Sequence, residues 1–379
     1  MPDPGRASTL TLFLCGDVMT GRGIDQVLPH PVDPVLYESY VKDARGYVQL
    51  AEKVNGPIPR PVDYAYIWGD ALAELERFRP DVRLINLETG VTTSEDKWEG
   101  KEIHYRMHPA NVPCLAAAKI DCCALGNNHV LDWGYRGLAE TLATLERAGL
   151  AGVGAGQDVI AARRPAAFAR PEGSQVIVFS LGLPTSGIPL AWRATAFKPG
   201  VNLLTQLSEE AIANIAQVVA AYRQAGSVVV ASIHWGSNWG YDIPAIEQEL
   251  AHRLIDAAGV DVVHGHSSHH VKGIEVYRER LILYGCGDLL TDYEGIAGHE
   301  TFRGDLSLLY FPEVDPATGH LLSLTMTPTQ MRRFQLQRAG SEAGAWLEAV
   351  LNREGKRLNT RVECDQEGRL HLLWGSDRA

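Results

Sequence analysis

Short apolar runs alternate with longer segments of helical periodicity along the first 300 residues of the chain. The apolar runs predict strands at Leu10–Cys15, Val82–Leu87, Ile120–Leu125, Ala151–Val153, Gln175–Leu181, Ser227–Ile233, Val260–Val263, Gly273–Tyr277 and Leu281–Tyr284. The helical patterns lie between them, at Asp70–Phe78, Pro113–Ala118, Leu138–Ala148, Ser208–Gln224 and Ala245–Ala258. This alternation predicts an α/β fold in layers, with the helices outside the sheets.

After about residue 300 the pattern becomes rich in strands. Strands are expected at Leu306–Phe311, His320–Thr327, Arg332–Gln337, Thr360–Cys364 and Leu370–Trp374, with one helix near Ala343–Asn352. We therefore expect a catalytic domain over residues 1–312 and a C-terminal β/α extension over residues 313–379, packed on the same domain.

Two segments show neither the helical pattern nor the apolar runs of strands. Prolines and tyrosines in the first half of Leu28–Pro61 argue against a helix there, and Thr89–Asn111 also reads as an irregular loop. Long loops in compact domains usually carry function, so both are expected to lie on the substrate side.

Composition and charge narrow the function classes. With 45% hydrophobic and 21% charged residues among 379, the chain can bury a large core, which excludes disordered and collagen-like classes. Lys+Arg 35 against Asp+Glu 46 gives a net charge of −11, which disfavours nucleic acid or an anionic membrane surface as a partner. No apolar run has the length of a membrane span, and the first one, at Leu10–Cys15, is too short for a signal sequence, so a cytoplasmic protein is expected.

Side chains of the types that commonly bind metals follow several of the expected strands. They are Asp17 in LFLCGDVM, Asn86 and Glu88 in VRLINLE, Asn127, Asn128, His129 and Asp132 in CCALGNNHVLDWG, His234 in VVVASIHWG, His264, His266, His269 and His270 in VDVVHGHSSHH, and Asp288 and Asp292 in LILYGCGDLLTDYEG. Because ligands in layered α/β folds lie outside the carboxyl ends of the strands, these side chains can converge although they are far apart in sequence.

Each residue alone has a simpler explanation. A strand-end Asp often caps a helix, a buried His is usually a core residue, and Asn is common in turns. Five such units in one chain are not explained by packing, and together they predict a centre for one or two divalent ions. The mixed oxygen and imidazole donors favour Mn, Fe or Zn over Mg or Ca.

The ordered motifs GDVM, NLE, GNNHVLDWG, IHWG and GHSSH, followed by IEVY and LILYGCGD, resemble those of the CapA family, named for poly-γ-glutamate capsule synthesis. That family is similar to the calcineurin-like metallophosphatases. The resemblance spans roughly Thr9 to Leu309 and implies a four-layer α/β/β/α sandwich with a dinuclear metal site.

The resemblance also implies roles for single residues. Asp17 would bind the first metal, Glu88 would bridge, and Asn128 and His234 would bind the second metal. His266 and His269 fall in the last motif, where the match is loose by one or two positions and His264 stays an alternative. His129 would be a general acid oriented by Asp132. Where the phosphatases have a His after the first Asp, this chain has Met19, a poor ligand for a hard metal.

Three functions are compatible with such a centre. The first is Cα epimerisation of the C-terminal residue of a ribosomal peptide, because the chain resembles the soluble CapA-like epimerases of lasso peptides in lacking an anchor. Asp17 and His299 are then the candidate bases, with His129 as the alternative. An aromatic rim would hold the peptide; its members are Trp133, Trp235, Trp239, Tyr241 and Tyr293.

The second function is metal-dependent phosphoester hydrolysis, with His129 protonating the leaving oxygen. The third is a metal-binding partner without catalysis in poly-γ-glutamate or peptide synthesis. The sequence favours the first of the three, and it predicts no oligomeric state.

Overall fold

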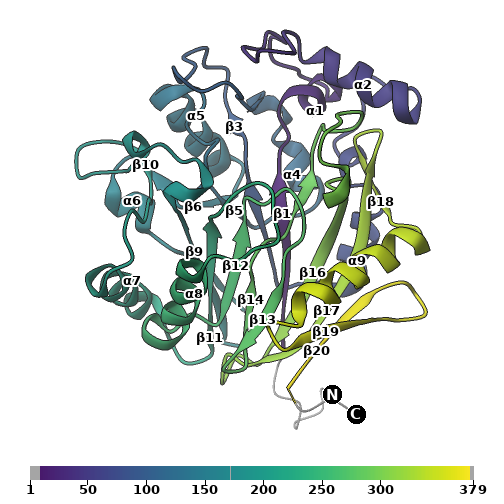
Figure 1. The fold of residues 1–379 in the computed structure, drawn as a ribbon. Helices are drawn as coiled ribbons and strands as arrows, with labels where there is room; N and C mark the ends of the chain where they lie inside the picture. The colour runs from purple at the N-terminus through teal and green to yellow at the C-terminus, as the bar shows by residue number, and fades with distance from the viewer. Residues whose placement is uncertain (1–8, 171, 376–379) are drawn as a thin grey trace.

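Two stacked sheets form the centre of the protein, whose computed structural model describes residues 9–170 and 172–375 (Figure 1). The order of the first sheet is β19-β20-β17-β16-β1-β2-β5-β6, with β15 paired to β1 and β18 to β17. Its strands are β1 (Leu10–Val18), β2 (Val82–Leu87), β5 (Cys122–Ala124), β6 (Ala151–Val153), β15 (Asp288–Leu290), β16 (Leu306–Val314), β17 (Leu321–Arg332), β18 (Gln335–Arg338), β19 (Thr360–Cys364) and β20 (Leu370–Trp374).

The second sheet has the order β13-β14-β12-β11-β9-β8. Its strands are β8 (Ala166–Ala169), β9 (Gln175–Gly182), β11 (Ser227–His234), β12 (Val262–His266), β13 (Ile274–Tyr277) and β14 (Arg280–Leu283). Two short ribbons complete the strands: β3 (Gly90–Val91) pairs with β4 (Arg106–Met107), and β7 (Ala155–Gly156) pairs with β10 (Gly200–Val201).

Helices cover the outer face of each sheet. The first sheet carries α1 (Arg22–Val27), α2 (Arg45–Asn55), α3 (Ala71–Phe78), α4 (Pro113–Ala117) and α5 (Gly134–Arg147), whereas the second carries α7 (Glu209–Tyr222) and α8 (Ala245–Ala258). The short α6 (Val159–Arg163) lies beside the β7–β10 ribbon, and α9 (Ser341–Gly355) lies near the C-terminus.

Alternation along β1 explains why two apolar layers meet at one strand. Leu12 and Leu14 pack into the core between the sheets, whereas Phe13 and Cys15 pack against the outer helices. A third core lies between the second sheet and α7 and α8. The four-layer α/β/β/α arrangement implied by the family resemblance is therefore confirmed.

The C-terminal part extends the first sheet. β17 pairs antiparallel with β16, and α9 adds Leu347, Val350 and Leu351 to the core between the sheets. The boundary expected at residue 312 lies inside β16, and the division into residues 1–312 and 313–379 stays a prediction.

The main correction concerns Leu28–Pro61, which the sequence predicts to be irregular. It contains α2, whose buried residues Tyr47, Val48 and Ala51 lie on one helical face. The prolines of the segment and Gly56 flank this stretch, and their presence hid the helical pattern between them. Thr89–Asn111 holds only short elements, as expected. Within the described residues, no helix combines the length and apolar character that crossing a membrane requires.

Candidate metal centre

Asp17 lies at the centre of the predicted constellation. It belongs to the end of β1, where the parallel register places it opposite Asn86 of β2 and Asp288 of β15. Asn86 Nδ2 donates to Asp17 Oδ1 at 2.7 Å, and the Ser267 backbone N–H donates to Oδ2 at 3.3 Å. Burial and the neighbouring charge of Asp288 raise the pKa of Asp17 to about 7.

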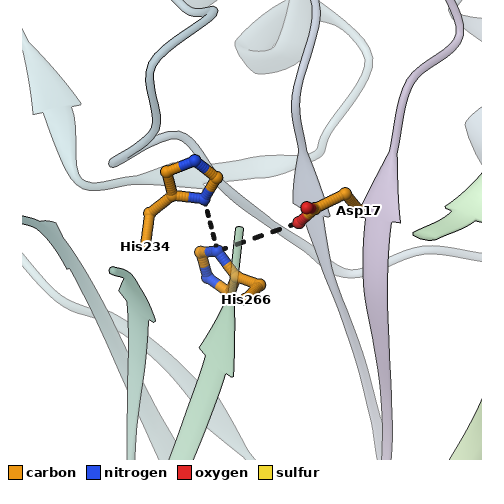
Figure 2. A group of neighbouring side chains, drawn as sticks. All are labelled: Asp17, His234 and His266. Carbon is orange, nitrogen blue, oxygen red and sulfur yellow. Dashed lines mark hydrogen bonds and ion pairs between the residues drawn. The ribbon is translucent and has the colours of Figure 1, made fainter. Parts of the chain in front are cut away.

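Asp17, His234 and His266 form a first group of converging donors (Figure 2). Paired positions at the ends of β11 and β12 bring the two imidazoles together, with 2.8 Å between their Nδ1 atoms. His266 Nδ1 is also 3.9 Å from Asp17 Oδ1. All three residues are fully buried, and burial lowers the pKa of both histidines.

Glu88 and Asn128 extend this group on the far side of His234. The His234 Nε2 atom lies 3.0 Å from Asn128 Oδ1 and 3.7 Å from Glu88 Oε1. Glu88 is buried, and burial together with the charge of Asp17 raises its carboxyl pKa. Four predicted ligands therefore lie close together: Asp17, Glu88, Asn128 and His234.

A second group shares Asp17 and adds His269 and Asp288. His269 Nδ1 lies 2.8 Å from Asp288 Oδ1, while the buried Asp288 Oδ2 has no hydrogen-bond partner among the described residues. Burial would lower the pKa of His269, but the charge of Asp288 outweighs it and raises the pKa. An unpartnered buried oxygen is costly, and a bound cation would satisfy it.

The two groups fit divalent cations. Three buried carboxylates, Asp17, Glu88 and Asp288, crowd one site, and each has a raised pKa. A bound cation would remove their mutual repulsion and would satisfy the facing ring nitrogens of His234 and His266. The donors combine carboxylate, amide and imidazole, as Mn, Fe or Zn sites do.

His129 lies beside the centre in a hydrogen-bonded triad. Its Nδ1 atom is 2.6 Å from Asp132 Oδ2, and its Nε2 atom is 3.7 Å from Glu88 Oε1. Burial lowers its pKa to about 4. Lys101, from the long loop, donates to Asp132 Oδ1 and to the Asn128 carbonyl, and its Nζ is 3.1 Å from His129 Nδ1.

The remaining predicted residues separate into two kinds. His264 has both ring nitrogens occupied, by Ser232 Oγ at 3.1 Å and the Cys15 carbonyl at 2.6 Å, so its contacts are those of a structural residue. His299 is exposed and stacks on Trp239, with 3.9 Å between the ring centroids. It is not a member of either donor group.

A cavity of about 690 Å³ joins the centre at His269. Trp239, Tyr293 and His299 lie on its walls, with Ile296 at the rim. Of the predicted aromatic rim, Trp133, Trp235 and Tyr241 do not line it. Trp235 instead donates its indole N–H to the Tyr284 carbonyl at 2.9 Å within a core, which is a packing role.

Arg22 supports one wall of this cavity. Its buried guanidinium binds Glu38 at 2.8 Å and Asp292, and its Cζ lies 4.6 Å from the centroid of the Tyr105 ring. The pair with Glu38 fixes the segment before α2 against the site, and the pair with Asp292 fixes the segment after β15. Two segments that supply cavity residues are thus held by one side chain.

Sequence reasoning left three participants outside the predicted ligand set or unnoticed. Asp288 and Asn86 are among the polar side chains that follow strands, but the sequence motifs assign neither of them a ligand role, and the sequence does not point to Lys101. Asp288 had a usable signal, because it follows an apolar run as Asp17 does. Lys101 had none, because a lysine in a polar loop is ordinary.

Comparisons with known proteins find matches along most of the chain. The family model described as bacterial capsule synthesis protein PGA_cap matches residues 11–293. A probable polyglutamine synthesis accessory protein of Mycobacterium tuberculosis is 50% identical over 370 residues, covering 97% of each chain. The PGA biosynthesis protein CapA of Bacillus subtilis is 30% identical over 284 residues, covering 75% of this chain and 63% of that protein. The capsule biosynthesis protein CapA of Bacillus anthracis is 23% identical over 283 residues, covering 75% of this chain and 60% of that protein.

Proposed function

The chain belongs to the PGA_cap family of bacterial capsule synthesis proteins, and from that premise we propose that it is a metal-dependent enzyme acting on a peptide. Relatives named for polyglutamine synthesis and for PGA biosynthesis support a role in making a peptide or polyglutamate. The two donor groups that share Asp17 support the metal. The substrate is then a chain with amide and carboxylate oxygens.

The proposed reaction is Cα epimerisation of the C-terminal residue of a peptide. The observation that carries it is the 690 Å³ cavity, which meets the candidate centre at His269 and has room for a residue with its side chain. A carboxylate placed at the centre would leave its Cα beside the cavity walls.

Bound divalent metal would supply stabilisation of the negative charge that develops on the substrate carboxylate when the Cα proton leaves. The chain itself supplies the proton carriers. Asp17 is shared by both donor groups, which favours a ligand role over its predicted role as a base. His129, with Nε2 towards Glu88, and His299, on the cavity wall, are then the two bases.

Exchange in deuterated water tests this proposal. The protein, loaded with Mn²⁺, would be incubated with a linear peptide and with a γ-linked glutamate oligomer, and the mass of each would be followed. We expect the parent protein to invert the C-terminal residue while its mass rises by one hydrogen-to-deuterium exchange, and we expect His129→Asn to form no epimer, because inversion needs both bases. Epimer formed by that variant at the parent rate would remove His129 from the proposal, and no exchange by the parent protein would remove the reaction.

Phosphoester hydrolysis is the second candidate, and the His129–Asp132 pair specifically favours it. A histidine held through Nδ1 by a carboxylate can protonate a leaving oxygen with Nε2. Release of nitrophenol from an aryl phosphate would support this reaction. If the protein binds metal but performs neither reaction, the non-catalytic partner role is the one that fits.

A further inference from the structure

A small lobe projects from the edge of the molecule outside both sheets. It consists of residues 155–164 and 188–201, and we name it the β10 lobe (left edge of Figure 1). The β7–β10 ribbon ties its two segments together, and the Val159 N–H donates to the Thr195 carbonyl at 2.9 Å. The lobe is therefore a defined element rather than two separate loops.

Its outer surface is unusually apolar. Phe197, at the tip of a turn closed by the Thr195–Lys198 bridge, is 99% exposed, and Ile160 and Leu190 are 71% and 66% exposed. Lys198 Nζ donates to the Ala191 carbonyl at 2.8 Å, which holds the turn beside Leu190. Because burying these side chains would be favourable, three in one small lobe indicate a surface that is covered in use.

The charge of the lobe is opposite to that of the whole chain. It contains four basic residues, Arg163, Arg164, Arg193 and Lys198, and one acidic residue, Asp158. Asp158 is occupied as the cap of α6, since its carboxylate accepts from the Ala161 N–H at 2.8 Å. None of the four basic residues forms an ion pair within residues 9–170 and 172–375.

We propose that the β10 lobe docks the protein on an anionic lipid bilayer, with Phe197 inserted at the interface and the four basic residues facing the headgroups. An exposed aromatic side chain together with Lys and Arg side chains in one small element is an arrangement that binds such surfaces. The positive charge of the lobe, whose one carboxylate is used as the cap of α6, complements an anionic lipid surface.

The net charge of −11 led to the expectation of no anionic membrane partner, but total charge does not describe a local surface. The acidic remainder of the protein would be repelled by the same headgroups, which would orient the lobe towards them. This orientation follows from charge alone and does not depend on the proposed reaction.

The base of the lobe lies beside the candidate centre. A Cβ at Gly187, just before the lobe, would lie 3.7 Å from Asn128 Nδ2, and Lys101 Nζ lies 5.2 Å from the ring centroid of Trp192 within it. The lobe is thus continuous with the side of the centre that holds Asn128.

Vesicle co-sedimentation of the full chain tests the proposal. The probes are phosphatidylcholine vesicles with and without phosphatidylglycerol, at low and at high salt. We expect binding only to the vesicles that contain phosphatidylglycerol, and weaker binding as salt rises. Absence of binding at low salt, or equal binding to both vesicles, would overturn the proposal.

Three variants locate the binding. Phe197→Ser should weaken it about tenfold or more, because one buried aromatic side chain is lost, and Arg164→Glu should weaken it and flatten the salt dependence. Leu322→Ser, at a half-exposed position on β17, is the matched control and should bind as the parent does. Equal binding by Phe197→Ser and Leu322→Ser would contradict the assignment.

Light scattering distinguishes lipid docking from the alternative that the lobe is a dimer interface. If the parent protein is a dimer that Phe197→Ser converts to a monomer, and neither binds vesicles, the lobe joins two copies of the chain and the lipid proposal is wrong.

Discussion

At the residue scale, the facing imidazoles of His234 and His266 are the clearest chemical feature of the site. Two neutral rings can place their Nδ1 atoms 2.8 Å apart by sharing one proton, but a cation beside both nitrogens satisfies them equally. Asp17, 3.9 Å from His266 Nδ1, would supply negative charge for that cation, and Glu88 faces the other ring nitrogen of His234.

Asp17→Asn should abolish most metal binding. The substitution keeps the shape and the hydrogen-bonding reach of the side chain but removes the charge shared by both donor groups. Metal content after dialysis, measured by mass spectrometry, is the readout. Asp25→Asn changes another buried carboxylate, on α1 and outside both groups, and should leave the content unchanged. Equal content in the two variants would contradict the assignment.

Asp132→Asn should lower turnover without lowering the amount of bound metal. Asp132 fixes the ring of His129 through Nδ1, so its loss should lower kcat by about 10²-fold whichever reaction is found. The bound metal should remain, because Asp132 belongs to neither donor group. Loss of metal with loss of activity would make Asp132 part of the metal centre instead.

The sequence predicts which side chains converge on the site where those side chains follow the end of a strand. Asp17, Glu88, Asn128, His234 and His266 share that position, and parallel strands bring such positions together. His299 lies in a loop, and only the fold shows that it reaches the cavity. Lys101 lies far along an irregular loop whose path is decided by tertiary contacts.

At the element scale, the close approach of β1 and β15 positions Asp17 and Asp288. Gly16 permits it, because a Cβ there would lie 1.7 Å from the Gly287 carbonyl oxygen. The strands were predictable from their apolar runs, and Thr360–Cys364 and Leu370–Trp374 have the expected bounds. The helix α2 was not, because proline, glycine and tyrosine near it dominated the pattern.

Gly16→Ala should destabilise the protein by about 3 kcal/mol or more, since the added methyl group meets backbone that cannot move without breaking strand pairing. Gly344→Ala is the control, because a Cβ there has open space within α9, and alanine should add about 0.5–1 kcal/mol. Denaturant titration gives both values. A stable Gly16→Ala variant would show that the strands can separate.

Glu247→Gln should stabilise the protein more at pH 8 than at pH 5. Glu247, in the first turn of α8, is fully buried, and neither carboxylate oxygen has a partner among the described residues. Burial raises its pKa from 4.5 to about 7, partly opposed by the charge of Lys272. The folded protein therefore holds this proton more tightly than the unfolded chain.

The tighter proton binding by folded Glu247 therefore contributes its full share to the free energy of unfolding below about pH 4.5. That contribution, about 3 kcal/mol, is lost as the pH rises through about 7. The difference in unfolding free energy between Glu247→Gln and the parent protein should grow over that range. A difference independent of pH would show that Glu247 is ionised in the folded protein at pH 5.

At the scale of the whole molecule, the candidate centre lies where the two sheets meet. Asp17 and Asp288 come from the first sheet and His234 and His266 from the second, so a cation bound by all of them would join the sheets. The sequence predicted both the four layers and this convergence, through motif order. It predicted neither the cavity nor the β10 lobe, because both depend on how distant loops pack.

Metal removal should lower the melting temperature. A ligand that binds only the folded state at about 100 times its Kd adds about 2.7 kcal/mol per site. Chelation followed by calorimetry should show a drop of several degrees that Mn²⁺ or Zn²⁺ restores, and Asp17→Asn should show neither change. If the protein binds metal but its melting temperature does not change when the metal is removed, the cation lies away from the junction of the two sheets.

The central claim is that residues from both sheets bind divalent cations at one centre. Anomalous diffraction from crystals soaked in Mn²⁺ measures this most directly, because it locates the ions themselves. We expect an anomalous peak within bonding distance of Asp17 and of His234 with His266, of His269 with Asp288, or of both pairs. A soaked crystal with no peak at these residues, or with its peaks elsewhere on the protein, would contradict the account.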